Sequence, residues 1–395
     1  MSKDRCPRRG LGALLFGLGL GAAVAAASPA AADAETATSP ATTPATARIS
    51  PAPGPAGAGP KVVKPARWTS RALPDRRAAV AARPGVTITR SGQSPVTLSS
   101  GRTGAAELSG ITYADGTTFY AVADNGAGSI WQLYASNARD GRIRSALVDS
   151  AIRAPAIGPD AEGIALNPGR DRVWIAEESS STISEFSLVS GEKVGSVAVP
   201  AIYRPANVQD NRGLEALSYG AGTLWTANEE ALRPDGPLAT TAAGSWVRLQ
   251  AFSGPDLAPH AQYGYRTDPI SVMSPFVSVE RSGLVDLVAL PGGEVLALER
   301  ELGGFIPLFR SRIYLLDFAG ATDVSELPSL ADAGFTPVAK TLLWQGYFAF
   351  INFEGITLAT DLSGSPLLML ISDDGGGELG QRQVLSSLLL RTPDG

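Results

Sequence analysis

Five segments of the chain repeat one pattern, and this repeat limits the possible folds more than any other feature. Each segment has a short apolar run, a turn, a second apolar run and a polar or acidic end, as in NRGLEALSYGAGTLWTANEE from Asn211. The segments begin at Glu107, Asp160, Asn211, Arg281 and Asn352. Glycine stands in every turn, which favours β-hairpins. The chain is therefore expected to be built from repeated hairpins.

The spacing of the hairpins indicates a ring of small sheets. Aligned on the first apolar run, the lead positions are Ser109, Glu162, Glu215, Asp286 and Glu354, which lie 53, 53, 71 and 68 residues apart. A period of about 50 residues with four strands is typical of propeller blades. We predict an all-β fold, a β-propeller of four-stranded antiparallel blades, with five blades recognisable and six possible. A β-sandwich also uses regular hairpins and is the competing interpretation.

The ends of the repeat predict how the ring closes. The last unit has a third strand, QVLSSLLL, and little after it. A strand from PGVTITR or PVTLSS at the start of the domain is expected to pair with it. Closing the ring in this way would protect the exposed sheet edges.

The N-terminal region predicts an exported protein. A basic start, an apolar run from Leu11 to Ala27 and small residues after it are typical of a cleaved signal peptide over 1–32, although a retained membrane anchor is an alternative. Residues 33–67 are rich in Ala, Pro and Thr and predict a disordered linker. The propeller is assigned to 68–395, with ordered structure starting between Trp68 and Val86. The expected location is secreted or periplasmic.

Composition excludes several classes of site. A net charge of −5 and a pI near 5.2 argue against nucleic-acid binding. The single cysteine, Cys6, falls in the predicted signal peptide, and the single histidine, His260, cannot build a zinc site alone. There is no G-x-S-x-G motif and no phosphate-binding loop.

Acidic residues are expected to gather at one mouth of the central channel. In a propeller the inner strand begins on the face where the second strand ends, so the lead positions and the hairpin ends meet there. The hairpin ends carry Asp124, Asn125, Glu177, Glu178, Asn228, Glu229, Glu230, Glu299, Glu301, Asp373 and Asp374. Crowded carboxylates need a cation or take up protons. Oxygen ligands favour Ca²⁺, although the same acids could simply fix the blade entries.

The candidate metal ligands are Glu162, Glu215, Asp286, Glu354, Asn228 and Glu229. Arginines stand among these acids, including Arg212, Arg281 and Arg300. Arginine beside a metal suits a phosphate ester, but it also balances a crowded acidic rim. Arg300 alternates with Glu299 and Glu301, so it is expected to point away from one or both of them.

Several motifs together resemble the phytase-like propeller family, whose members are described as having esterase-like activity of phytase. They are AEGIAL, NRGLEALSY, TLWTANEEAL, VDLVALPGGEVLALERE, SRIYLLDF and NFEGITL. The resemblance covers roughly residues 86–390 and extends more distantly to the calcium-dependent propeller phytases. It implies a phosphoester-hydrolysing role that uses metal-bound water. The lysines outside the signal peptide are Lys61, Lys64, Lys193 and Lys340, so phosphate binding would fall on arginine. This departure puts phytate itself in doubt.

Three functions remain open at this point. The first is a calcium-dependent phosphoric-ester hydrolase, in which Glu178 or Glu230 acts as general base and Arg212 and Arg300 stabilise the phosphate. The second is a non-catalytic propeller that binds a partner or an envelope component through loops in 230–280 and 301–350. The third is a calcium-dependent carboxylesterase or lactonase. We expect a small-molecule ester substrate, no membrane contact after signal cleavage, and a monomer.

Overall fold

The computed structural model describes residues 85–101, 103–126, 128–209, 211–271, 281–303 and 308–392. The predicted signal peptide, the linker and the start of the domain lie outside these residues. All described residues belong to one compact unit, Ala66–Gly395. Among the described residues, no helix has the length and apolar character needed to cross a membrane.

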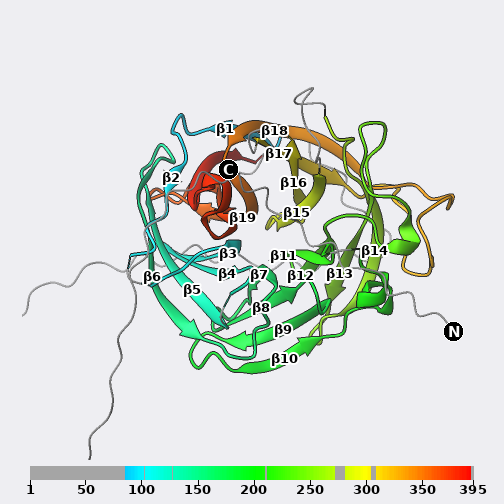
Figure 1. The fold of residues 1–395 in the computed structure, drawn as a ribbon, viewed down its shortest axis with the longest axis horizontal. Coiled ribbons are helices and arrows are strands. Elements are labelled where there is room, and N and C mark those ends of the chain that lie inside the picture. Colours follow the sequence, from blue (N-terminus) through cyan, green and yellow to red (C-terminus); the bar gives the residue numbers. More distant parts are fainter. Residues whose placement is uncertain are drawn as a thin grey trace, which may run out of the picture. The chain divides into compact units, whose positions relative to one another are not determined.

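The described residues form a β-propeller of five four-stranded antiparallel blades (Figure 1). The first blade contains β3 (Leu108–Asp115), β4 (Thr118–Ala123), β5 (Ser129–Asn137) and β6 (Ile143–Arg153). The second contains β7 (Ala161–Leu166), β8 (Arg172–Glu177), β9 (Thr182–Ser187) and β10 (Lys193–Val197). The third contains β11 (Leu214–Gly220), β12 (Thr223–Asn228), β13 (Trp246–Ser253) and β14 (Ala258–Arg266). The predicted fold class is confirmed.

The last two blades complete the ring. The fourth contains β15 (Arg281–Ala289), β16 (Val295–Gly303), β17 (Leu308–Asp317) and β18 (Ala339–Ala349). The fifth contains β19 (Asn352–Thr360), β20 (Pro366–Asp373) and β21 (Val384–Arg391), and β1 (Thr87–Arg90) and β2 (Val96–Thr97) both pair with β21. Ring closure by an N-terminal strand is therefore confirmed, and both candidate segments take part.

The longer repeat intervals contain outer strands of the third and fourth blades, so the described residues form no sixth blade. Short 3₁₀ helices lie in the connections: η1 (Ala201–Tyr203), η2 (Pro205–Asn207), η3 (Arg233–Asp235) and η4 (Gly375–Gly380). The inner strands β3, β7, β11, β15 and β19 stand around the centre of the ring (Figure 1). The first residues of these inner strands, together with the last residues of the second strands, form the mouth of the channel.

Apolar side chains between neighbouring blades form the core. Phe353, Leu370 and Leu298, for example, are fully buried in one cluster shared by the fourth and fifth blades. Each such side chain contributes roughly 1.5–3 kcal/mol on burial. Trp225 on β12 packs on Phe318, which follows β17 in the next blade, with ring centres 4.9 Å apart. This packing holds the blades around a fixed channel.

A β-bulge at the start of each inner strand places the acids at the channel mouth. In three blades one extra residue interrupts the pairing with the second strand, and that residue is Glu162, Glu215 or Glu354. A bulged residue is left out of the ladder and its side chain is turned aside. The acid that repeats in the sequence therefore occupies the same β-bulge in three blades.

The bulge also corrects the sequence alignment in the fourth blade. There the extra residue is Val285, because Leu284 pairs with Glu299 and Asp286 with Leu298. Asp286 therefore corresponds to Gly163 and Gly355, one position further along. The alignment placed it one residue too early because LVDL carries its acid at the third position, whereas LEAL carries it at the second.

Candidate active site at the channel mouth

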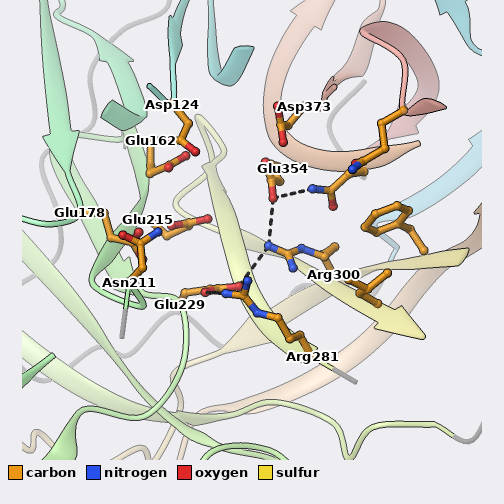
Figure 2. A pocket seen from close by; sticks show the side chains of 14 residues that line it. Asp124, Glu162, Glu178, Asn211, Glu215, Glu229, Arg281, Arg300, Glu354 and Asp373 are labelled. Atoms are coloured by element: carbon orange, nitrogen blue, oxygen red, sulfur yellow. Dashed lines mark hydrogen bonds and ion pairs between the residues drawn. The ribbon is translucent and has the colours of Figure 1, made fainter. Parts of the chain in front are cut away.

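The five blades enclose a small polar cavity of about 200 Å³ at the mouth of the channel (Figure 2). It is lined by Asp124, Glu162, Glu178, Asn211, Glu215, Glu229, Arg281, Arg300, Leu302, Phe309, Asn352, Glu354, Asp373 and Gln381. Residues nearly 260 positions apart in the chain therefore meet at one place. The acidic side chains that the repeat predicted for this mouth form most of its polar lining.

Three glutamates on one side of the cavity, Glu162, Glu178 and Glu215, form what we call the mouth cluster. Each has a carboxylate oxygen within 4.8 Å of those of the other two. All three are buried, with 6 %, 1 % and 6 % of their surface exposed. Glu162 lies on β7, Glu215 lies on β11 and Glu178 follows β8, and Figure 2 shows the three side chains facing one another. A single small cation placed between them would contact all three.

The mouth cluster has few hydrogen-bond donors of its own. The amide of Gly213 donates to Glu178 over 2.8 Å, and Ser109 donates to Glu162. Among the described residues, none donates a hydrogen bond to the carboxylate of Glu215. Burial, followed by repulsion from neighbouring carboxylates, raises the pKa of Glu162 and Glu215 well above the usual range. The same causes raise the pKa of Glu178 to about 9.

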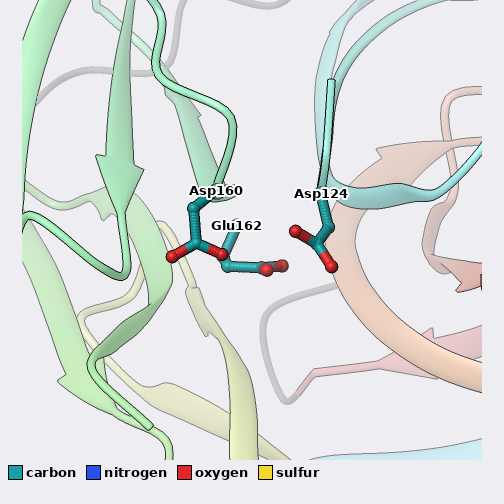
Figure 3. A group of neighbouring side chains, drawn as sticks. All are labelled: Asp124, Asp160 and Glu162. Atoms are coloured by element: carbon teal, nitrogen blue, oxygen red, sulfur yellow. The ribbon is translucent and has the colours of Figure 1, made fainter. Parts of the chain in front are cut away.

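Glu162 also belongs to a second acidic group with Asp124 and Asp160 (Figure 3). Asp160 accepts a hydrogen bond from the amide of Ser179 over 2.7 Å. Asp124 comes from the end of β4 and faces the other two side chains across the gap between blades (Figure 3). Burial, with repulsion from Asp160 adding to it, raises the pKa of Asp124 to about 6.

Two arginines occupy the opposite side of the cavity. Arg300 on β16 reaches Glu229 over 3.1 Å and Glu354 over 2.9 Å. Arg281 reaches the other oxygen of Glu229 over 3.2 Å. Figure 2 shows Arg300 between the two acids, pointing toward the mouth cluster. Arginines of the protein therefore neutralise Glu229 and Glu354, whereas none of the described residues forms an ion pair with the mouth cluster.

Two polar groups of the fifth blade complete the lining. Asn352 donates to Glu354 over 2.7 Å, but its Oδ1 is buried and has no hydrogen-bond partner among the described residues. Asn352 is only 7 % exposed. Burial, with repulsion from Glu354 next, raises the pKa of Asp373 to about 8. The cavity thus contains a buried oxygen acceptor without a donor beside carboxylates that favour protonation.

The structure brings six of the ten candidate site residues into the cavity. They are Glu162, Glu178, Glu215, Glu229, Glu354 and Arg300. Arg300 also faces away from Glu299 and Glu301, as its alternation on β16 predicted. Those two acids do not line the cavity, because they bind Arg312 on the other face of the strand.

The other four candidates do not line the cavity, and the structure gives each of them another partner. Asn228 accepts from the amide of Arg248 and donates to the carbonyl of Glu230. Glu230 pairs with Arg212 over 2.8 Å. Asp286 accepts three backbone amides, from Leu217, Leu287 and Ile356. These contacts tie strands and loops together rather than face the channel.

Asp286 takes the place of a glycine at the closest approach of the inner strands. Gly163 and Gly355 sit so near the next inner strand that a Cβ would strike its backbone. At the same position, the carboxylate of Asp286 fills the space and joins β11 to β19. Burial raises the pKa of Asp286, whereas the three amide donors act in the opposite direction.

The candidate list omitted Asp160, Asn211 and Asn352 although each opens one of the repeats. Asn211 has a positive φ of 55°, a backbone conformation that asparagine tolerates better than most residues. Their position before the first apolar run was the available signal. Asp124 and Asp373 were expected at the mouth but were not assigned a role.

Comparison with known proteins gives one family. A family model described as "Phytase-like: Esterase-like activity of phytase" matches residues 103–376. No curated protein matches the chain. Among solved structures, glutaminyl cyclase from Myxococcus xanthus is 13 % identical with a TM-score of 0.35, covering 77 % of this chain and 96 % of that one. The PQQ domain of pyranose dehydrogenase from Coprinopsis cinerea is 8 % identical with a TM-score of 0.36, covering 80 % and 98 %. Likeness this slight has no bearing on function.

Proposed function

The chain belongs to the phytase-like family, and from this premise we propose that it is an exported, divalent-cation-dependent hydrolase of phosphoric esters. The observation that supports the proposal most strongly is the mouth cluster, which is buried, forms no ion pair with any described residue and faces Arg300 across one cavity. Carboxylates in this state must take up protons or a cation. These carboxylates would be the ligands of a cation, and the opposite side of the cavity, with Arg281 and Arg300, would remain available to an anion.

The donor atoms fit a hard cation. Every polar side chain on the acidic side of the cavity offers oxygen, and the chain has one histidine and one cysteine. Calcium prefers six to eight oxygen ligands and accepts irregular geometry. Glu162, Glu178 and Glu215 would hold the ion, and the orphaned Oδ1 of Asn352 is a further acceptor in the same cavity. When bound, such an ion supplies Lewis acidity toward an ester oxygen and toward water.

The protein's own residues would orient the ester and move the proton. Arg300 and Arg281 would hold a phosphoryl oxygen by charge-assisted hydrogen bonds. Asp124 replaces both Glu178 and Glu230 as the proposed proton acceptor. Glu178 is placed among the ligands of the ion, and Glu230 is bound to Arg212 outside the cavity. Asp124 lines the cavity and has a pKa raised to about 6. A carboxylate with a pKa in that range is ionised at neutral pH and still returns its proton.

The test compares metal dependence with a matched pair of variants. Protein stripped by a chelator is titrated with Ca²⁺ while hydrolysis of p-nitrophenyl phosphate and bis(p-nitrophenyl) phosphate is followed. We expect turnover to depend on Ca²⁺ and to be lost in Glu215→Gln. The control is Glu192→Gln, an exposed carboxylate on the β9–β10 turn. Unchanged activity in a folded Glu215→Gln protein would overturn the assignment.

The esterase-like description of the family supports a second candidate, a calcium-dependent carboxylesterase or lactonase acting at the same cavity. The choice of substrate distinguishes the two candidates. A carboxylesterase or lactonase would hydrolyse aryl acetates and lactones, whereas the proposed hydrolase would act on phosphate esters. Calcium-dependent stabilisation without turnover of either class would favour the non-catalytic alternative.

Export is a separate part of the proposal, and it rests on the sequence of residues 1–32. Sequencing the N-terminus of the mature protein tests it. We expect cleavage before Asp33, whereas an intact N-terminus would support a retained anchor.

A further inference from the structure

The cavity's charge limits the esters that it can accept. Its described lining contains seven carboxylates and only two guanidinium groups, Arg281 and Arg300. Both arginines are already paired with Glu229 or Glu354. One bound divalent cation would leave the fully ionised cavity negative, and two would bring it close to neutral. Such a site repels a ligand with one negative charge much less than it repels a polyanion.

The size of the cavity also disfavours large polyanionic substrates. Its volume is about 200 Å³, below the roughly 300–1,000 Å³ that encloses a drug-sized ligand. Only the reacting group and one small substituent fit within it. A ring that carries several phosphates would have most of its charge outside, away from both arginines.

The arginine side of the cavity also has an apolar part. Arg281, Leu302 and Phe309 are directly paired across β15, β16 and β17. Side chains opposite one another in a sheet point to the same face. Arg300 lies two residues before Leu302 on β16 and shares this face. The anion-binding groups therefore stand directly beside two hydrocarbon side chains, and both Leu302 and Phe309 line the cavity.

We propose that the preferred substrates are phosphodiesters with a single negative charge and an apolar substituent, and that Leu302 and Phe309 determine this specificity. The inference rests on the proposed function and narrows its substrate class. Arg300 would bind the one charged phosphoryl oxygen, and the apolar substituent would lie on Leu302 and Phe309. In the reaction, the oxygen of water forms a bond to phosphorus and the bond to the leaving oxygen breaks. Asp124 receives one proton from the attacking water and returns it to solvent, and the leaving oxygen takes up one proton from solvent, so that the diester and water give a monoester and an alcohol.

The first experiment measures kcat/KM on three substrates with free Ca²⁺ held constant. They are bis(p-nitrophenyl) phosphate, p-nitrophenyl phosphate and inositol hexakisphosphate, which carry increasing charge. We expect the diester to exceed the monoester about tenfold or more, and the hexakisphosphate to be neither hydrolysed nor inhibitory. Preferential hydrolysis of the hexakisphosphate or of the monoester would overturn the inference.

The second experiment tests Leu302 with a matched control. Methyl p-nitrophenyl phosphate and bis(p-nitrophenyl) phosphate share a leaving group and differ in the apolar substituent. Leu302→Ala should raise KM for the aryl diester about tenfold and change the methyl ester little. The control is Leu362→Ala, which is 67 % exposed on the β19–β20 turn. Equal effects on both esters would contradict a specificity role for Leu302.

A binding measurement separates this inference from the proposed function. Calorimetry on calcium-loaded protein compares diphenyl phosphate with phenyl phosphate. Tighter binding of diphenyl phosphate, weakened by Leu302→Ala, would support the inference even if no ester were hydrolysed, and the hydrolase proposal alone would then fail. Tighter binding of phenyl phosphate would overturn the inference while leaving calcium-dependent hydrolysis intact.

Discussion

Two buried acidic groups in this propeller differ in what neutralises them. The mouth cluster consists of Glu162, Glu178 and Glu215. The second group, which we call the blade-four cluster, consists of Glu299, Glu301 and Asp268 with Arg312 and Lys340. Glu299 and Glu301 are fully buried. Arg312 reaches Glu299 over 3.2 Å and contacts Glu301, and Lys340 lies 2.8 Å from Asp268.

The blade-four cluster shows that this chain supplies cations where a buried acid serves the structure. Burial raises the pKa of Asp268, but the hydrogen bonds from Lys340 and Tyr314 hold it below its usual value. At the mouth, burial and then repulsion from Glu229 and Asp160 raise the pKa of Glu178 to about 9, and the opposing effects of the Gly213 amide and Arg281 are smaller. The difference supports our proposal that the mouth cluster binds a cation from outside the chain.

The largest expected effect comes from removing the built-in cation. Arg312→Met would leave Glu299 and Glu301 buried without their main partner, and breaking a buried ion pair costs about 3–5 kcal/mol. We expect a loss of stability of this size in urea unfolding, and no change in the apparent affinity for Ca²⁺. An unaltered unfolding midpoint would mean that the blade-four cluster is not held by Arg312.

A somewhat smaller loss is expected at Asp286, the acid that accepts three backbone amides. Asp286→Ala would leave buried amides without acceptors, at about 1–3 kcal/mol for the least compensated of them. We predict a lower melting temperature both with and without Ca²⁺, by similar amounts. A calcium affinity that fell with this variant would instead return Asp286 to the list of metal ligands.

Removing a carboxylate from the mouth cluster, in contrast, should not destabilise the metal-free protein. In metal-free protein, Glu215→Gln removes a repelling charge, so stability should stay equal or rise. Wild-type protein should gain about 2.7 kcal/mol at a calcium concentration one hundred times Kd, and the variant should lose this gain. Thermal melting with and without Ca²⁺ measures both effects. Destabilisation of the metal-free variant would show that Glu215 is a structural acid.

The last expected difference between the two states is a pH dependence that calcium removes. A carboxylate with a raised folded pKa binds more protons in the folded state, so its contribution falls as pH rises from the unfolded value through the folded one. For Glu178 that window runs from about 4.5 to about 9, and for Asp373 from about 3.8 to about 8. The metal-free melting temperature should fall across this range. Saturating Ca²⁺ should flatten the profile, and equal slopes in both states would contradict the account.

The sequence was sufficient to predict the propeller, its five blades and its closure. Hairpin turns and apolar runs are local signals, and strands repeated at a regular period have few arrangements. The site was predicted in part, since Glu162, Glu215 and Glu354 occupy the same bulge position in three blades. The alignment of Asp286 with the glutamates of the other blades was wrong, because an apolar run in the sequence does not show a one-residue shift beside a bulge.

The remaining site residues depend on contacts between blades. Arg300 and Glu299 are adjacent in the sequence, yet they face opposite sides of β16 and belong to different clusters. The alternation of side chains along a strand predicted that the two point to opposite faces, but it did not predict which of them faces the channel. Asn352 was missed because its importance lies in an unpaired oxygen that only the folded cavity reveals.

The most direct test of the central claim is an anomalous difference map from crystals grown with Ca²⁺. We predict a peak about 2.3–2.6 Å from carboxylate oxygens of Glu162, Glu178 and Glu215, and no peak in the blade-four cluster. A mouth cluster without density at saturating Ca²⁺, or an ion bound instead beside Glu299 and Glu301, would contradict it.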